Sequence, residues 1–170
     1  ERALELEQQV YDIQVKQLGK QHISVASTLN ELALFKFYNK EENANVESLF
    51  NQSLEVIDQN LGKNNLIYAE VLKNMSLFYL GTNETTKAEK AIDVAYKIWI
   101  EKFGDQNKHI AEYYYIKGNI DFTKKDFVNA NNDYISAKNL YQVVFNNKHP
   151  DYIKALGKSA QMQYVLGDYK

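Results

Sequence analysis

The sequence predicts an all-α fold, an α-solenoid of antiparallel helix pairs with about eight helices. Two observations predict it. First, a Leu or Phe followed by Gly or Asn recurs at separations of 43, 42 and 42 residues, and repeats of this length are typical of stacked helical pairs. These turn motifs are Leu18-Gly19, Leu61-Gly62, Phe103-Gly104 and Phe145-Asn146. Second, 170 residues include one proline and seven glycines, which favours long helices with short connections.

The register of the repeat persists within each unit. Seven residues past each Gly or Asn come Ala26, Ala69, Ala111 and Ile153, and three further on come Leu29, Leu72, Tyr114 and Leu156. Next come Leu32, Met75, Lys117 and Ser159, each followed by a small residue: Ala33, Ser76, Gly118 and Ala160. Small side chains at these positions should let two helices approach closely. In the second half of each unit, three sets of equivalent positions lie on one helical face. They are Val46, Ala88 and Ala130; Leu49, Ala91 and Asp133; and Val56, Ile98 and Leu140.

The pattern places the first helix of each pair at 24–38, 66–80, 108–124 and 150–166, and the second helix at 2–18, 45–61, 86–103 and 127–145. Gly19, Gly62 and Gly104 are expected in the left-handed conformation after a helix. The side chains expected to cap helix N-termini are Ser24, Asp126 and Asp168, and Pro150 fits the first turn of its helix.

We expect residues 1–170 to form a single repeat array cut from a longer protein, because the chain begins at Glu1 without an initiator Met. In this reading 1–23 holds the second helix of a preceding repeat. Full repeats occupy 24–65, 66–107 and 108–149, and 150–170 is the first helix of a following repeat.

Composition excludes several classes of function. The formal charge of -2 gives no general attraction to nucleic acid or anionic lipid. The chain has no cysteine, which removes disulfides, thiolate metal sites and cysteine nucleophiles. Since no apolar stretch is long enough to span a bilayer, we expect a soluble, cytoplasmic domain without nucleic-acid or membrane partners.

Motifs for catalysis or cofactor binding are missing from the sequence, which has no phosphate loop, HExxH or GxSxG pattern. The three histidines are His22, His109 and His149, and His22 and His149 occupy the same position in different repeats. A whole repeat separates equivalent positions, so we expect these two to serve loop structure and not a shared metal ion. We therefore expect no enzymatic activity, no cofactor and no metal site.

Two segments resemble a known repeat family. "LGKQHISVASTLNELALF" (18–35) and "FNNKHPDYIKALGKSAQMQYVLGDY" (145–169) are similar to the "LG..HP.VA.TLNNLA.LY...GDY" pattern of kinesin-light-chain-type tetratricopeptide repeats (TPR), which also occur in bacterial TPR-CHAT proteins. The resemblance covers essentially the whole chain, although Lys36 and Glu42 stand where the family usually has aromatic residues. It implies a right-handed superhelix whose concave side is lined by the first helix of each pair.

Mapped onto this sequence, the resemblance implies a concave face for a protein or peptide partner. Its expected residues are Asn30, Leu34 and Phe37; Lys73, Leu77 and Leu80; Tyr115, Asn119 and Phe122; and Gln161 and Tyr164, with Glu70 and Glu112 adding charge at the rim. Amide side chains can bond a peptide backbone while aromatic and aliphatic ones hold apolar side chains. The predicted function is therefore a protein-interaction scaffold.

Alternatives stay open at this point. Leu34, Phe37, Leu77 and Phe122 could simply pack between neighbouring helices, and Asn30 or Asn119 could bond one. A helix of the same full-length protein could fill the face. The array could also be the regulatory arm of a larger enzyme, such as a caspase-like protease of the CHAT type, or a spacer that self-associates through uncapped ends.

Overall fold

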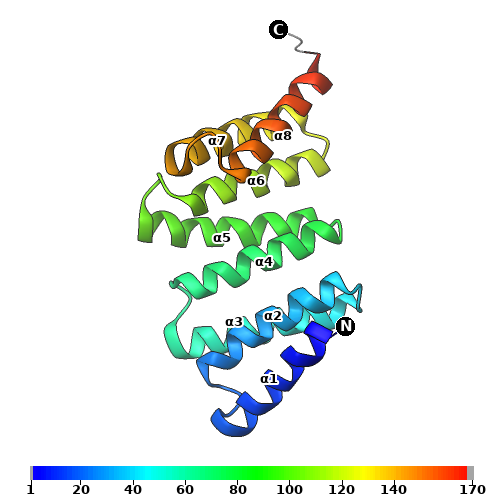
Figure 1. The fold of residues 1–170 in the computed structure, drawn as a ribbon, viewed down its shortest axis with the longest axis vertical. Helices are drawn as coiled ribbons and strands as arrows, with labels where there is room; N and C mark the ends of the chain where they lie inside the picture. The colour runs from blue at the N-terminus through cyan, green and yellow to red at the C-terminus, as the bar shows by residue number, and fades with distance from the viewer. Residues whose placement is uncertain (1, 168–170) are drawn as a thin grey trace. The chain divides into compact units, whose positions relative to one another are not determined.

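The computed structural model describes residues 2–167, and these form eight α-helices and no strand (Figure 1). The helices are α1 (Arg2–Leu18), α2 (Ile23–Tyr38), α3 (Asn43–Leu61), α4 (Leu66–Gly81), α5 (Thr85–Phe103), α6 (Lys108–Thr123), α7 (Phe127–Phe145) and α8 (Pro150–Leu166). Each observed boundary lies within two residues of the predicted one. The all-α prediction and the helix order are confirmed.

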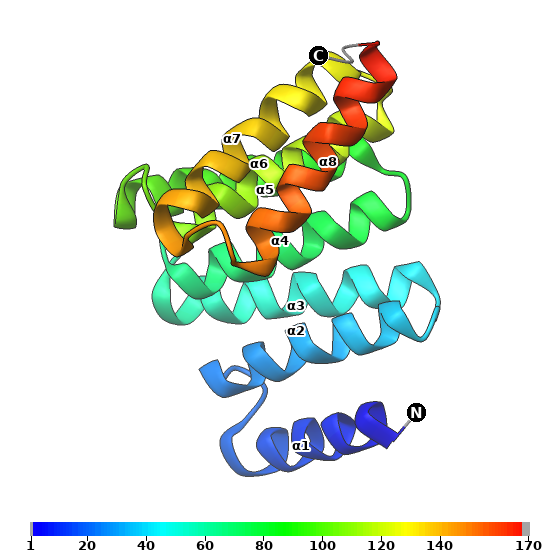
Figure 2. The ribbon, with the colours of Figure 1, turned by 45° about the horizontal axis from the view of Figure 1, so that its top comes forward.

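The chain divides into two compact units, residues 1–78 and residues 79–170, and the division falls inside α4. In the first unit α1 packs on α2 and α2 on α3, and Figure 2 shows these three helices side by side. In the second unit α5 packs on α6, α6 on α7 and α7 on α8. Each of these five pairs consists of helices that follow one another in the sequence.

The core of the first unit lies between α2 and α3. Ala26, Leu29 and Ala33 of α2 are buried, as predicted from their register. On α3, Phe50 is buried, and the hydroxyl of buried Ser53 donates a hydrogen bond to the backbone oxygen of Ala26 (2.7 Å). This buried bond fixes the register of α3 on α2.

The core of the second unit is rich in tyrosine. Tyr141 clusters with Ala111, and Tyr134 clusters with Met162. A Cβ atom added to Gly118 would lie 2.7 Å from two ring carbons of Tyr134, closer than carbon atoms can approach. The prediction of a close helix contact at this small residue is confirmed.

On α8, the residues at the register positions that are buried on α2 are exposed. Ile153 is 56% exposed, Leu156 is 43% exposed, and Ala160 is exposed as well. The described helices contact α8 through other residues, among them Ala155 and Met162. The stripe that is buried on α2 is therefore open on α8.

The backbone itself carries the repeat. Positive φ angles of 84°, 76°, 74° and 86° occur after the second helices, and angles of 60°, 64°, 64° and 78° occur after the first helices. Both series have separations of 43, 42 and 42 residues, and they are Gly19, Gly62, Gly104 and Asn146, then Lys40, Asn83, Lys125 and Gly167. The predicted positive-φ glycines are confirmed, and the second series shows that the turn closing each first helix also repeats.

The helix caps follow the same spacing. Ser24 is not the cap of α2, because it lies inside the helix and its amide donates to the Nδ1 atom of His22 (3.2 Å). His149 caps α8 in the same way, and Asn65 and Asn107 accept amide hydrogen bonds at the equivalent positions of α4 and α6. An imidazole or amide three residues past the turn thus replaces the expected Ser, because its acceptor atom reaches the same backbone amides.

Two other predictions about helix starts are confirmed. Asp126 caps α7 by accepting from the amide of Asn129 (3.2 Å), and Pro150 occupies the first turn of α8. Asp168 lies outside the described residues.

Candidate functional site

In the first unit, the predicted partner-binding residues of α2 lie one helical turn apart along one side of the helix. Asn30 is only 7% exposed, and its Oδ1 atom accepts a hydrogen bond from Nδ2 of Asn74 on α4 (3.1 Å). Leu34 and Phe37 are half-buried, and the ring of Phe37 meets the buried ring of Phe78 edge-on at 5.4 Å. Asn30 and Phe37 therefore already contribute to packing within this unit.

The predicted residues of α4 include an internal ion pair. Glu70 and Lys73, one turn apart, form a salt bridge, and the Lys73 side chain is 17% exposed. Leu77 and Leu80 are half-buried on the same helix. Because the two charges neutralise each other, this part of the face offers little net charge to a partner.

In the second unit, the predicted residues of α6 have neighbours on α7 and α8. The Oδ1 atom of Asn119 accepts a hydrogen bond from the hydroxyl of Tyr134 (2.9 Å). Tyr115 is half-buried with its ring 5.8 Å from that of Tyr134, and the ammonium of Lys158 lies 5.5 Å from the ring centre of Phe122. Asn119 thus serves the fold, while Tyr115 and Phe122 are partly accessible.

Glu112 lies near the start of α6 beside an aromatic stack. Its carboxylate is 3.6 Å from Nδ1 of His109, and the imidazole stacks on Trp99 (5.1 Å) and on Phe103 (5.4 Å). Trp99 is buried. His109 is thus a packing residue between α5 and α6.

The most accessible predicted residues lie on α8. Gln161 is exposed, and Tyr164 is 71% exposed. The ring of Tyr164 is thus largely accessible to water, whereas the side chains of the two predicted asparagines are hydrogen-bonded to Asn74 and Tyr134. The structure thus packs Tyr115 and Phe122 against the same buried cluster, which includes Tyr134 and Met162, and it leaves Gln161 and Tyr164 exposed.

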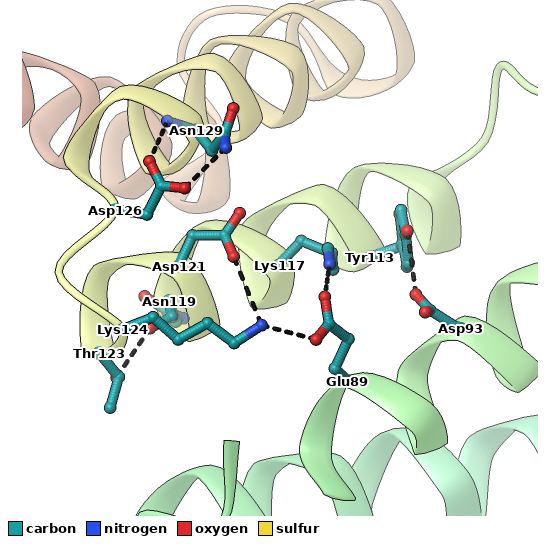
Figure 3. A network of polar contacts seen from close by, with 10 residues as sticks. All are labelled: Glu89, Asp93, Tyr113, Lys117, Asn119, Asp121, Thr123, Lys124, Asp126 and Asn129. Atoms are coloured by element: carbon teal, nitrogen blue, oxygen red, sulfur yellow. Dashed lines mark hydrogen bonds and ion pairs between the residues drawn. The ribbon is translucent and has the colours of Figure 1, made fainter. Parts of the chain in front are cut away.

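A polar network in the second unit was not predicted. Glu89 of α5 accepts hydrogen bonds from Lys117 of α6 and from Lys124, the residue that follows α6, and the hydroxyl of Tyr113 donates to Asp93 (3.1 Å) (Figure 3). These two ammonium groups hold the pKa of Glu89 below its ordinary value. The network joins α5 to α6 by charge, and Lys117 occupies the position that Leu32 and Met75 hold in the other repeats.

Asp133 is the unusual member of this region. Its position corresponds to Leu49 and Ala91 in the other repeats, yet it carries a carboxylate. Burial, and secondly the nearby charge of Asp121, raise the pKa of Asp133 to about 7. Aligning the repeats is enough to single out Asp133, because an acid at an otherwise apolar position is a local exception to the pattern.

Two shallow depressions lie along α3 in the first unit. One is lined by Lys36, Asn45, Ser48, Leu49 and Gln52, and the other by Ala44, Glu47, Ser48, Asn51, Gln52 and Glu55. Apart from Lys36 their lining belongs to α3, a second helix. These depressions are the alternative to the predicted face on the first helices.

Residues 2–167 contain neither a cluster of metal-binding side chains nor a membrane-spanning helix. Across this part of the chain, no three His, Asp or Glu side chains are grouped to hold a metal ion. None of the helices described here is long and apolar enough to cross a bilayer.

Comparison with solved structures gives likenesses over nearly the whole chain. TPR-like repeats of a Podosopora anserina protein assigned as a kinesin light chain match with a TM-score of 0.77 at 15% identity, covering 99% of this chain and 79% of that one. A Q17M form of the same protein gives a TM-score of 0.78 with the same identity and coverage. BtubC (BKLC) from P. vanneervenii gives a TM-score of 0.83 at 15% identity, covering 99% of this chain and 66% of that one.

No protein-family profile matches the sequence, and the comparison with curated proteins gives no match. The likenesses therefore establish the fold alone: the chain has the fold of TPR-like helical repeats, as its sequence resemblance predicts.

Proposed function

We propose that the chain is a protein-interaction scaffold that binds an extended peptide or an amphipathic helix of a protein partner through the first helices of its repeats. The TPR-like repeat fold is in general a fold of interaction scaffolds. The observation that carries the proposal further is the open aromatic and amide surface of Gln161 and Tyr164 on α8.

The chemistry of this face favours a partner that is held by apolar contacts and hydrogen bonds. Tyr115 and Phe122 expose part of their rings, and aromatic rings are the residues that most often anchor interfaces. At the rim, Glu70 and Lys73 form an ion pair within the chain. We therefore expect binding to depend only weakly on salt concentration.

A selection of random peptides displayed on phage, with the wild-type chain as bait, tests the proposal. We expect selected peptides to lose at least about tenfold in affinity, about 1.4 kcal/mol, for the double variant Gln161→Ala, Tyr164→Ala. Tyr38→Ala is the matched control, because Tyr38 is also 71% exposed but lies outside the predicted face. Selected peptides that bind the double variant and the wild type equally would place the binding surface elsewhere.

A further inference from the structure

The first helices of the repeats begin with two kinds of cap. The caps of α2 and α8 are the imidazoles of His22 and His149, and the equivalent caps of α4 and α6 are asparagines. In both imidazoles the acceptor is Nδ1, which lies 3.2 Å from the amide nitrogen of Ser24 and 3.3 Å from that of Asp151. An imidazole nitrogen accepts a hydrogen bond only while it carries no proton, whereas the oxygen of an asparagine has no proton to gain in mild acid. The starts of α2 and α8 therefore depend on neutral histidines.

No acid compensates a charge on His22. The side chain is exposed, and the first turn of α2 contains no acidic residue. The charged side chains at and just past the adjoining ends of α1 and α3 are Lys16, Lys20, Asp58 and Lys63. Asp58 is paired with Lys63 (3.6 Å), and within residues 2–167 no carboxylate forms an ion pair with His22. A proton on His22 removes the cap and places a positive charge at the positive end of the helix dipole.

His149 differs because an acid lies beside it. The Oδ2 atom of Asp151 is 3.6 Å from Nδ1 of His149, and Oδ1 of the same carboxylate accepts a hydrogen bond from Lys154 (3.2 Å). Glu112 of α6 adds to the acidic surroundings: burial, and then the charges of Glu112 and Asp151, raise the pKa of Tyr141 on α7. A protonated Nδ1 can donate to Asp151, so α8 exchanges its neutral cap for an ion pair.

We propose that the start of α2 is a pH-sensitive point of the chain, at which protonation of His22 releases the first turn, whereas Asp151 holds the start of α8 when His149 is protonated. The unfolded chain has no cap to lose, so protonation of His22 removes a contact from the folded state alone. The stabilising effect of this cap is present at about pH 8 and disappears as the pH falls to about 5, the range in which histidine titrates.

Nuclear magnetic resonance on the isotope-labelled chain follows the cap directly. As the pH falls from about 8 to about 5, the amide resonance of Ser24 should shift in step with protonation of the His22 imidazole. The amide of Ile67 is the internal control, because Asn65 accepts its hydrogen bond at the equivalent place of α4 (2.8 Å), and it should show no such shift. A Ser24 amide that keeps its resonance while His22 takes up its proton overturns the proposal.

The variant His22→Asn measures what the cap contributes, because it places at α2 the residue that caps α4 and α6. Between about pH 8 and about pH 5, the unfolding constant of the wild type in urea should rise about twofold to fivefold more than that of His22→Asn, the range expected for one helix cap. Asp133 also titrates in this range, but it is present in both proteins and cancels in the comparison. Equal changes in the two proteins contradict the proposal.

The variant His149→Asn is the matched control at the other imidazole cap. Its unfolding constant should differ from that of the wild type by less than about twofold over the same pH range, because Asp151 compensates the charge on His149. In an Asp151→Asn background that compensation is lost, and the same replacement should become as pH-dependent as His22→Asn. A pH effect of His149→Asn that equals that of His22→Asn in the natural sequence, or one that does not grow when Asp151 is replaced, overturns the contrast between the two helix starts.

Discussion

Two helix pairs at equivalent places in the repeat, α2 with α3 and α6 with α7, solve the same packing problem with different residues. Where α3 has buried Phe50, α7 has buried Tyr134. Where α2 has Leu34, α6 has Asn119, and this amide accepts the hydrogen bond of the Tyr134 hydroxyl. A hydroxyl added to a buried ring needs a polar partner, and the neighbouring helix supplies one.

The small residue changes together with the ring. Ala33 of α2 corresponds to Gly118 of α6, where even a Cβ atom would strike the ring of Tyr134. The comparison teaches that the register of the repeat is kept by groups of residues that change together. The chemistry of each pair can therefore differ while the helices keep their positions.

The largest effect should follow from closing the space beside Tyr134. Gly118→Leu should lower the free energy of unfolding by about 1–3 kcal/mol or more, because the added atoms overlap the ring. Urea titration measures the change. Gly157→Leu is the matched control, since no atom lies within 4 Å of a Cβ added at Gly157 of α8, and equal losses in the two variants would contradict the contact.

The second-largest effect should come from replacing Asn119 and Tyr134 by Leu and Phe, the residues at the equivalent positions of α2 and α3. Asn119→Leu alone should cost about 1–3 kcal/mol, because it leaves the Tyr134 hydroxyl without its acceptor. Adding Tyr134→Phe recreates the residues of α2 and α3 and should recover most of the loss. A double-mutant cycle in urea checks this, and strictly additive single effects would show that the two residues are not coupled.

A smaller, pH-dependent effect should come from Asp133, whose partly exposed carboxylate is screened by water. Its pKa rises from the ordinary 3.8 to about 7 in the folded protein, so the folded state holds the proton more tightly than the unfolded state. The acid therefore lowers stability progressively as pH rises from about 4 to about 7.

The variant Asp133→Asn removes this titration. Thermal melts should show that its gain in melting temperature over the wild type is larger at pH 8 than at pH 5. A gain that is the same at both pH values would mean that Asp133 ionises in the folded protein as it does in the unfolded chain.

The smallest effect should come from the turn after α7. Asn146 has φ 86° and ψ 174°, a conformation close to the one that its equivalents Gly62 and Gly104 adopt without a side chain. Asn146→Gly should raise the free energy of unfolding by about 1 kcal/mol, the relieved backbone strain being partly offset by the lost bond from the amide of Lys148 to the Asn146 side chain. Gly104→Asn should lower stability by a similar amount, and a stabilising Gly104→Asn would contradict the argument.

The sequence predicts the helices well because the turn motif and the apolar positions repeat together. It predicts the roles of individual polar residues poorly. The predicted face includes Asn30 and Asn119, yet the side chains of both form hydrogen bonds within the protein, to Asn74 and Tyr134. The sequence alone does not show that these partners lie opposite the two asparagines. The cap at His22 was missed because capping by an imidazole depends on the local turn and not on residue type alone.

The exposed apolar residues Ile153 and Leu156 of α8 show that the sequence does not by itself predict burial. Ile153 follows the register of Ala26, but whether a position is buried depends on a neighbouring helix and not on the residue itself. Asp133 and Lys117 are the exceptions that the aligned repeats do display, and both belong to the region where the structure places its charged network.

Chemical-shift mapping of a selected peptide on the isotope-labelled chain tests the central claim most directly, because it reports which helices meet the partner. We expect the largest changes at side chains of the first helices, including Leu77, Tyr115 and Tyr164. Changes confined to Ser48 and Gln52, in the depressions along α3, would contradict the account.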